Sequence, residues 1–500
     1  MGAMGDSQYT PLVDDLEPIK TYSLFTGFAL CINLIVGTGV FNLPFAFYNS
    51  GLVLAVVLLI ISGFFSWMCL VWVLEICARA EGITAQKEHN LEQPIHCISM
   101  RKFDFNELCH FFYGFKGKLG CQLFLSLYCY GLLWAYAAVF SDSVNNLFWQ
   151  FYRKIECSLV DTHDCHIGYY VCLVVYACIV VPVSLLNVTE QAVVQVMLTC
   201  YRFVAFGVMV VTVSVALAYP VNPNDFVNNT LQNVTADKNV WVNWSGFAGI
   251  FTTAAVALNF HFTIPDLVRP VEKKKFLPHM TTAALIVASS FYILVGILCS
   301  RFFKSNTESL ATLNWQTYTG LEGGWGGDLN ARPWWAVVVQ FIVMLFPIFD
   351  MLSVFPLVAV TLGENLCQMF PGGNIFAVIR PGKPFSRSVE RDIRISHTVC
   401  RLFSSVPPII LAFALKGLSD IFDFTGLFAF FLQLIVPCLL QLKSRSICEN
   451  TWGPSSWKTI YTNFISANGF VYSALVFGIG ALIFALLDFI AVKVNPNFWG

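Results

Sequence analysis

Two charged residues lie deep inside long apolar stretches of the chain. Arg202 falls about eleven residues into the stretch 191–219, a depth of roughly 16 Å along a helix, and Asp350 lies near the middle of 333–360. A charge at such depth costs about 2.5 to 3.5 kcal/mol on insertion scales, so these residues usually pair or mark an ion pathway. We expect Arg202 to pair with Asp350 or to occupy the space of a bound cation.

Two other apolar stretches contain helix-breaking residues. The stretch 33–44 reads N-L-I-V-G-T-G-V-F-N-L-P, and the stretch 259–265 reads N-F-H-F-T-I-P. In hydrocarbon every backbone N–H and C=O needs a partner, so a break is tolerated only where protein, water or a ligand supplies one. The two motifs therefore predict a ligand site.

The broken helices would present complementary groups to such a ligand. Amides freed at the first break offer donors and a positive helix end to a carboxylate. Carbonyls near Asn33 and at the second break can accept from an ammonium or coordinate a cation. A zwitterion such as an amino acid matches both groups, and we assign its binding to Gly37, Thr38, Gly39, Ala257 and Asn259.

His261 lies within the second break and allows two interpretations. With an unperturbed pKa of about 6.5, it could carry a coupling proton. The alternative is a hydrogen-bonded histidine with a purely structural role.

The composition places these motifs in a membrane. Of the 500 residues 57 % are hydrophobic and 12 % are charged, against about 25 % charged in soluble domains. Net charge of −1 argues against nucleic-acid partners. Stretches of about 20 apolar residues predict eleven spans, at 22–44, 51–77, 119–148, 167–187, 191–219, 245–267, 280–300, 333–360, 396–415, 418–442 and 466–490.

The charges between the spans predict their orientation. With a cytosolic amino terminus, twenty of the 29 Lys and Arg residues fall on cytosolic segments and eight on the opposite side, in line with the positive-inside rule. The first residues show no cleavable signal peptide. The odd number of spans then places the carboxy terminus outside or in a lumen.

The breaks occur in the first and sixth spans, which is the spacing of an inverted repeat of five helices. We therefore expect an all-α polytopic membrane protein with two five-helix repeats and one extra helix. The predicted parts are a cytosolic tail at 1–21, repeats at 22–219 and 245–442, an outer loop at 220–244, and the last span with the outer terminus at 443–500.

Covalent modification is predicted on the outer side. Asn228, Asn233 and Asn243 each begin an N-x-S/T sequon in one outer loop. Cys157 and Cys165 lie in another short outer loop, in a compartment that permits disulfides. A metal site with the nearby histidines 163 and 166 fits no standard ligand spacing, so a disulfide is the favoured interpretation.

Three further features bear on location and packing. Residues 9–12 read Y-T-P-L, a pattern that can direct sorting, so we expect the plasma membrane or an endosomal or lysosomal membrane. Glu75 and Arg79 end the second span, where snorkelling to the interface would explain them. The outer segment 301–332 is either disordered or a cover over a vestibule.

The motif I-N-L-I-V-G-T-G-V-F-N-L-P resembles the first helix of the amino acid/auxin permease family, and the stretches N-F-H-F-T-I-P-D-L-V and F-P-I-F-D-M-L-S-V-F-P resemble one branch of it. The resemblance implies the leucine-transporter fold. In sodium-coupled members an Asn of the first helix and a hydroxyl of the eighth contribute to a cation site, and Asn33 and Ser353 match them. His261 matches the family's histidine in the sixth helix. Arg202 and Asp350 depart from the pattern.

These features favour secondary active transport of amino acids or related small zwitterions by alternating access, proton-coupled or ion-independent, with H⁺ or Na⁺ as the candidate coupling ions. The alternative is a membrane receptor that senses an amino acid without substantial flux. We expect no enzyme and no cofactor, because the sequence carries no nucleophile elbow, nucleotide loop or metal-ligand cluster. The expected partners are the small-molecule substrate and the lipid bilayer.

Overall fold

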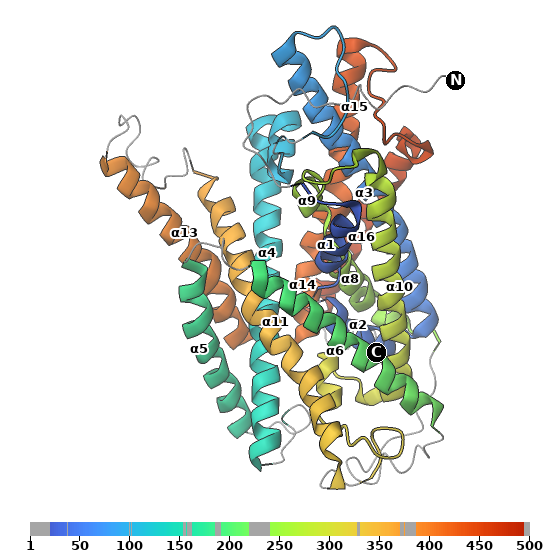
Figure 1. Ribbon diagram of the computed structural model, residues 1–500, viewed down its shortest axis with the longest axis vertical. Helices are drawn as coiled ribbons and strands as arrows, with labels where there is room; N and C mark the ends of the chain where they lie inside the picture. Colours follow the sequence, from blue (N-terminus) through green and yellow to red (C-terminus); the bar gives the residue numbers. More distant parts are fainter. Residues whose placement is uncertain are drawn as a thin grey trace.

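The computed structural model describes residues 21–37, 39–99, 101, 103–153, 157, 163–185, 192–219, 241–327, 331–370, 375 and 387–494. Ten helices in these ranges are long and apolar enough to cross a membrane. The pair α1 and α2, bent by 54°, brings the number of spans to eleven when it is counted as one. The structure thus confirms the predicted polytopic helical fold and the order of its spans (Figure 1).

Each predicted span corresponds to a helix or to a broken pair of helices. The first is the pair α1 (Leu24–Ile35) and α2 (Gly39–Ser50), and the sixth is the pair α8 (Phe247–Ala257) and α9 (Ile264–Val268). The others are α3 (Leu52–His89), α4 (Phe105–Arg153), α5 (His163–Leu185), α6 (Ala192–Ala218), α10 (Leu277–Phe303), α11 (Trp334–Cys367), α13 (Arg387–Ala414), α14 (Leu418–Phe430) with the π-turn Phe431–Ile435 and α15 (Val436–Trp452), and α16 (Asn468–Val494).

The breaks of both pairs lie inside the helix bundle, whereas one side of α1 is exposed. Helix α2 packs against α8 and α10, and α8 packs against α14 and α3. Helices α5 and α13 pack against each other, α4 and α11, and form one edge of the bundle in Figure 1. The unbroken helices therefore surround the breaks and position them.

Three helices extend beyond the predicted spans at the end of the bundle where α1 begins. Helix α3 continues to His89, α4 begins at Phe105 with an interruption at Gly114 (φ 67°), and α15 continues to Trp452. This extension makes the snorkelling interpretation of Glu75 and Arg79 wrong, because both side chains are fully buried. They lie inside protein rather than at a lipid interface.

A network of hydrogen bonds satisfies this buried ion pair. Arg79 binds Glu75 across one helical turn, at 2.5 Å between Nη2 and Oε2. The remaining donors of Arg79 reach the Trp457 carbonyl at 2.8 Å, Gln441 Oε1 at 2.7 Å and Ser444 Oγ at 2.9 Å. Glu75 also accepts from Gln441 Nε2 at 2.7 Å and from the Ser466 hydroxyl. The network joins α3 to α15 and to the turn Phe464–Ser466.

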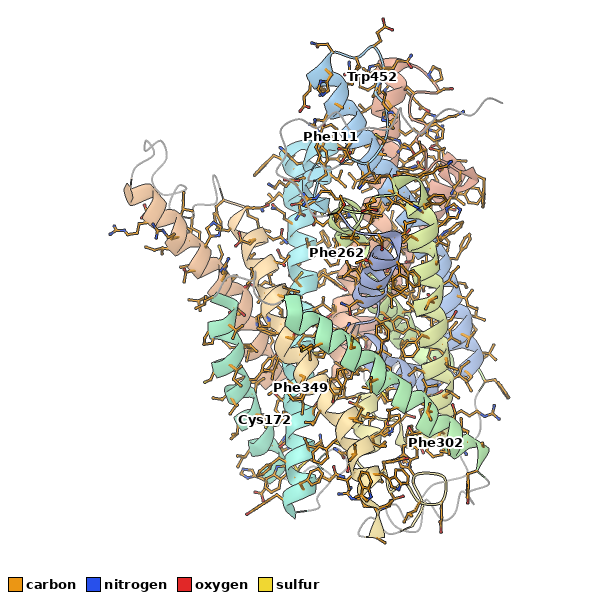
Figure 2. All side chains as sticks on the ribbon, in the orientation of Figure 1. Phe111, Cys172, Phe262, Phe302, Phe349 and Trp452 are labelled. Carbon is orange, nitrogen blue, oxygen red and sulfur yellow. A yellow bond between two sulfur atoms is a disulfide. The ribbon has the colours of Figure 1, made fainter. Side chains whose placement is uncertain are left out.

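The described part of the outer segment between α10 and α11 is folded. The short helix η7 (Ala311–Trp315) contacts α2 and α11. Trp315 is fully buried and donates through Nε1 to Thr212 Oγ1 at 3.1 Å. The Trp325 ring lies 4.9 Å from that of Phe302, which Figure 2 labels at the end of α10. The packing of the described part argues against the disordered alternative.

Removing Arg79 should destabilise the fold. The variant Arg79→Ala leaves the Glu75 carboxylate buried without its counter-charge, which typically costs about 3–5 kcal/mol. We expect a clearly lower thermal midpoint for the purified protein in detergent. The exposed Arg301, replaced in the same way, is the control and should leave the midpoint unchanged. Equal midpoints for the two variants would contradict a stabilising network.

Candidate functional site

The breaks of the first and sixth spans touch each other. Helix α1 ends at Ile35, and Val36 leaves the helical conformation with ψ of 80°. Helix α8 ends at Ala257. A Cβ added at Gly39 would lie 2.5 Å from the Ala257 Cβ, closer than real Cβ contacts allow. The structure thus brings Gly39 and Ala257, two residues that we assign to ligand binding, into contact. Thr38 lies outside the described residues.

We expect from the sequence that the Gly37 amide binds a ligand, but in the structure this amide already has a partner. It donates to the Ile35 carbonyl, two residues earlier, at 2.8 Å. The predicted donors at this break therefore reduce to Thr38 and to the start of α2 at Gly39. The first amides of a helix have no partner within the helix, and they carry its positive dipole end.

Arg202 of α6 donates hydrogen bonds to oxygens at the carboxyl end of α1. Its Nη1 donates to three oxygens, the Asn33 carbonyl at 3.1 Å, Asn33 Oδ1 at 2.9 Å and the Val36 carbonyl at 2.8 Å. Arg202 is only 6 % exposed. The carbonyls that we expected to receive an ammonium or a cation are thus already occupied by a guanidinium.

Asp350 of α11 supplies the opposite charge. Its Oδ1 accepts from Arg202 Nη2 at 2.6 Å, and the two side chains are 4 % and 8 % exposed. This contact confirms the predicted pairing. Because a charge pair in a buried site needs further hydrogen bonds to offset desolvation, the α1 carbonyls and Asp350 act together on one guanidinium.

Tyr292 of α10 joins both breaks and was missed by sequence reasoning. Its hydroxyl lies 2.6 Å from the Ile35 carbonyl and 3.4 Å from the Ala257 carbonyl, and its side chain is fully buried. The surrounding span is uninterrupted and apolar, so the only signal in the sequence is a mid-span phenol that must find a partner.

Asn259 presents an unsatisfied amide at the second break. The residue is 7 % exposed, and its Oδ1 and Nδ2 make no hydrogen bond of ordinary geometry among the described residues, although the Tyr128 hydroxyl lies close enough to interact with the amide. It lies beside Tyr128 of α4, whose ring packs edge-on against that of Phe262. Figure 2 labels Phe262 within the bundle. A buried amide without such hydrogen bonds costs about 1–3 kcal/mol, so it is a strong candidate to bind a ligand.

His261 is held by the backbone of α3. Its Nε2 lies 2.9 Å from the Ser66 carbonyl, and the residue is fully buried. Because a carbonyl only accepts, this contact requires a proton on Nε2. The geometry favours the structural interpretation of His261.

Ser353 lies three residues after Asp350 on α11 and is half-buried. The described contacts of Arg202 are with Asn33, Val36 and Asp350. The assignment of Ser353 to a cation site rests on the family pattern alone.

The predicted modification sites are described only in part. Cys157 and Cys165 form the expected pair, with Cα atoms 5.6 Å apart. Asn243 begins a short helical turn, and its Nδ2 donates to the Asn49 carbonyl at 2.7 Å. The sequons at Asn228 and Asn233 lie outside the described residues, as does the motif at 9–12. Glycosylation at all three sequons stays a prediction.

Comparison with known proteins matches the family model described as "Transmembrane amino acid transporter protein" to residues 20–484. The chain belongs to this family of amino acid transporters. It is also similar to Transmembrane protein 104 homolog of Drosophila melanogaster, at 24 % identity over 88 % of this chain and 92 % of the relative. Human Transmembrane protein 104 is 22 % identical over 87 % of this chain and 90 % of its own length. The Dictyostelium discoideum homolog is 23 % identical over 86 % of this chain and 90 % of its own length.

These similarities confirm the family and its branch. The family model covers residues 20–484, which include the first ten spans and most of the last. The relatives are named as transmembrane proteins only, and their names specify neither substrate nor coupling ion.

The contact between the breaks can be tested with two glycine variants. Gly39→Ala places a methyl group 2.5 Å from Ala257 Cβ, and overpacking of this kind costs about 1–3 kcal/mol. Gly37→Ala is the control, because its added Cβ meets only the Ile35 oxygen, at 3.9 Å. We expect a lower thermal midpoint for Gly39→Ala than for Gly37→Ala. The opposite order would rule out the close contact.

Proposed function

We propose that this chain is a secondary active transporter of amino acids or related small zwitterions, in which the Arg202 guanidinium replaces a coupling cation. Membership of the amino acid transporter family supports the general class. The ion assignment rests on one observation, the set of oxygens around Arg202. These are two carbonyls, an amide oxygen and a carboxylate, the ligands that hard cations prefer.

A covalently held cation changes how transport is driven. A sodium ion can bind with substrate and leave with it, whereas the charge of Arg202 stays in the protein. Sodium binding at the same oxygens would require the guanidinium to leave and Asp350 to find another partner. We therefore propose transport that is independent of sodium, either ion-independent or coupled to protons.

The substrate is proposed to lie at the junction of the breaks. The amino end of α2, beginning at Gly39, suits the carboxylate. The α1 carbonyls are engaged by Arg202 and Tyr292, so the ammonium is assigned to the second break. There Asn259 Oδ1 makes no hydrogen bond of ordinary geometry among the described residues. Gly37 and Thr38 complete the proposed wall on the side of the first break.

The contacts at the two ends of the site support alternating access. At one end, Tyr22 bridges to the segment after α9, with its N–H 3.0 Å from the Pro270 carbonyl and its carbonyl 3.2 Å from the Glu272 N–H. At the other end, the segment with η7 packs against α2 and α11. If either the Tyr22 contacts or the η7 contacts opened while the other set stayed closed, the site would be exposed to one side of the membrane only.

Uptake into proteoliposomes tests this function. The purified chain is assayed with a panel of radiolabelled amino acids, in sodium and with sodium replaced by choline, with and without a pH gradient. We expect uptake of at least one amino acid that persists in choline. Strict sodium dependence would refute the ion replacement, and saturable binding without flux across the panel would identify a receptor instead.

Variants of Arg202 test the role of its charge. Arg202→Met leaves Asp350 and the α1 carbonyls without a donor, so we expect uptake to fall at least tenfold. Arg202→Lys keeps the charge but loses the planar fork, and should retain more uptake than the Met variant. The monodisperse elution of each variant controls for folding. Uptake by Arg202→Met at the wild-type rate would overturn the assignment.

A further inference from the structure

Three consecutive lysines, Lys273, Lys274 and Lys275, follow the sixth span on the predicted cytosolic side. Such a run agrees with the positive-inside rule, which treats the three charges as equivalent. In the structure their side chains differ. Lys273 and Lys275 are exposed, whereas Lys274 is half-buried and turns its ammonium toward the end of α9. The middle lysine therefore has a role beyond orienting the chain.

The ammonium of Lys274 binds carbonyls at the end of α9. Its Nζ donates to the Val268 carbonyl at 3.0 Å and also to the Arg269 carbonyl. The last carbonyls of a helix have no partner within the helix. Because Val268 is fully buried, its carbonyl needs a donor from the protein, and Lys274 supplies one. Lys274 thus caps the inner half-helix of the sixth span from outside that helix.

Further contacts of Lys274 join α9 to two other parts of the bundle. The Lys274 carbonyl accepts from the hydroxyl of Tyr461, a residue that is 3 % exposed. Glu81 of α3, a buried carboxylate that accepts from the Ser99 amide, lies near enough to attract the ammonium. Helix α9 itself packs against α3 and α1 (Figure 1). One lysine therefore links the half-helix to α3 and to the segment that carries Tyr461.

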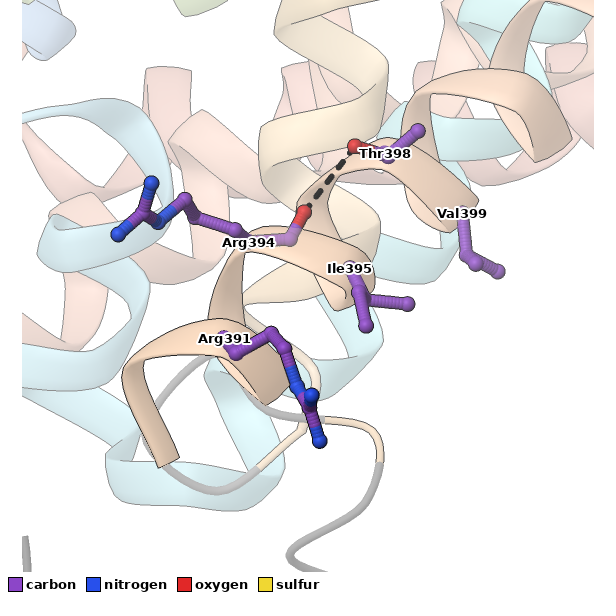
Figure 3. A pocket seen from close by; sticks show the side chains of 5 residues that line it. All are labelled: Arg391, Arg394, Ile395, Thr398 and Val399. Atoms are coloured by element: carbon purple, nitrogen blue, oxygen red, sulfur yellow. Dashed lines mark hydrogen bonds between the residues drawn. The ribbon is translucent and has the colours of Figure 1, made fainter. Parts of the chain in front are cut away.

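Two arginines of α13 on the same predicted side are arranged differently. Figure 3 shows Arg391 and Arg394 at a hollow on the surface of that helix, with their guanidinium groups directed apart. The residues that line this hollow all belong to α13. Lys274 instead donates to the backbone of another helix. Its charge is turned into the protein, where it replaces a missing hydrogen-bond donor.

Helix α9 depends on such contacts for its position. It comprises only Ile264–Val268, and a helix of this length is not stable through its own hydrogen bonds. It lies between the second break and the predicted cytosol, so its position decides whether that side of the site is closed. Cys77 of α3 lies beside Asp266 of α9 and is 4 % exposed. A movement of α9 away from α3 would uncover this thiol.

We propose that Lys274 is the latch of the sixth span. Its ammonium holds α9 against α3 while the predicted cytosolic side is closed, and release of the two carbonyls lets α9 move and that side open. The role in opening rests on the transport proposed above, whereas the latch itself is measured without transport. Lys274 acts on the site through the backbone of α9, so it is a positioning residue.

Alkylation of Cys77 in the purified full chain tests the latch. The protein in detergent is treated with iodoacetamide, and the labelled positions are quantified by mass spectrometry. We expect Lys274→Met to raise the labelling rate of Cys77 about fivefold or more, because local opening exposes the thiol. Lys273→Met and Lys275→Met remove the same charge from neighbouring positions and should label as the wild type does. Equal rates for the three variants would overturn the latch.

Cys69 on the same helix distinguishes release of α9 from general loosening. It is fully buried, and its thiol faces the Leu434 carbonyl of the π-turn at 3.9 Å. Its labelling should stay at the wild-type rate in every variant. A parallel rise at Cys69 and Cys77 in Lys274→Met would refute a local latch. If that variant does not fold, Lys274→Gln, which loses the charge but keeps a polar side chain, decides the result, and wild-type labelling of Cys77 would then overturn the latch.

Uptake into proteoliposomes separates the latch from the proposed transport. We expect Lys274→Met to lower uptake severalfold relative to Lys273→Met. If Cys77 is uncovered but uptake is unchanged, the role of Lys274 in opening is refuted. If Cys77 is uncovered and the wild type moves no amino acid of the panel, the transport function fails while the latch stands. If the wild type transports and Lys274→Met changes neither labelling nor uptake, the latch alone fails.

Discussion

A broken helix in hydrocarbon is stable only if its carbonyls find donors, and here one guanidinium supplies them. Arg202 binds the last turn of α1 through the oxygens of Asn33 and Val36, and Asp350 balances its charge. These contacts fix α6 and α11 against the first break. The position of the break, and therefore of Gly39 against Ala257, depends on this buried charge pair.

Tyr292 extends the same constraint to the second break. A hydroxyl has one proton, so it donates strongly to only one of the two carbonyls that it faces, Ile35 or Ala257. Donating to one carbonyl or to the other shifts a hydrogen bond from one broken helix to the other. Asn259, whose amide makes no hydrogen bond of ordinary geometry among the described residues, is the group at this junction that a ligand would satisfy most directly.

The sequence predicts the spans, both breaks and the Arg202–Asp350 pair, because hydropathy, glycine, proline and mid-span charge are local signals. It does not predict that Glu75 and Arg79 are buried, since their cover comes from residues near position 460 that approach only in the folded chain. The Tyr292 contacts are missed for the same reason. The sequence also suggests that the Gly37 amide binds a ligand, whereas in the structure it donates to the Ile35 carbonyl in a tight turn. No local sequence pattern distinguishes an amide bound in such a turn from one that is open to a ligand.

The bridge between Tyr22 and the segment after α9 has a mechanical consequence. It is made by main-chain groups, and the Tyr22 hydroxyl adds a hydrogen bond to the Leu267 carbonyl of α9. It also ties Tyr22, two residues before α1 begins, to the segment that follows α9. A displacement of Tyr22 would therefore act on α1 and on the segment after α9 together.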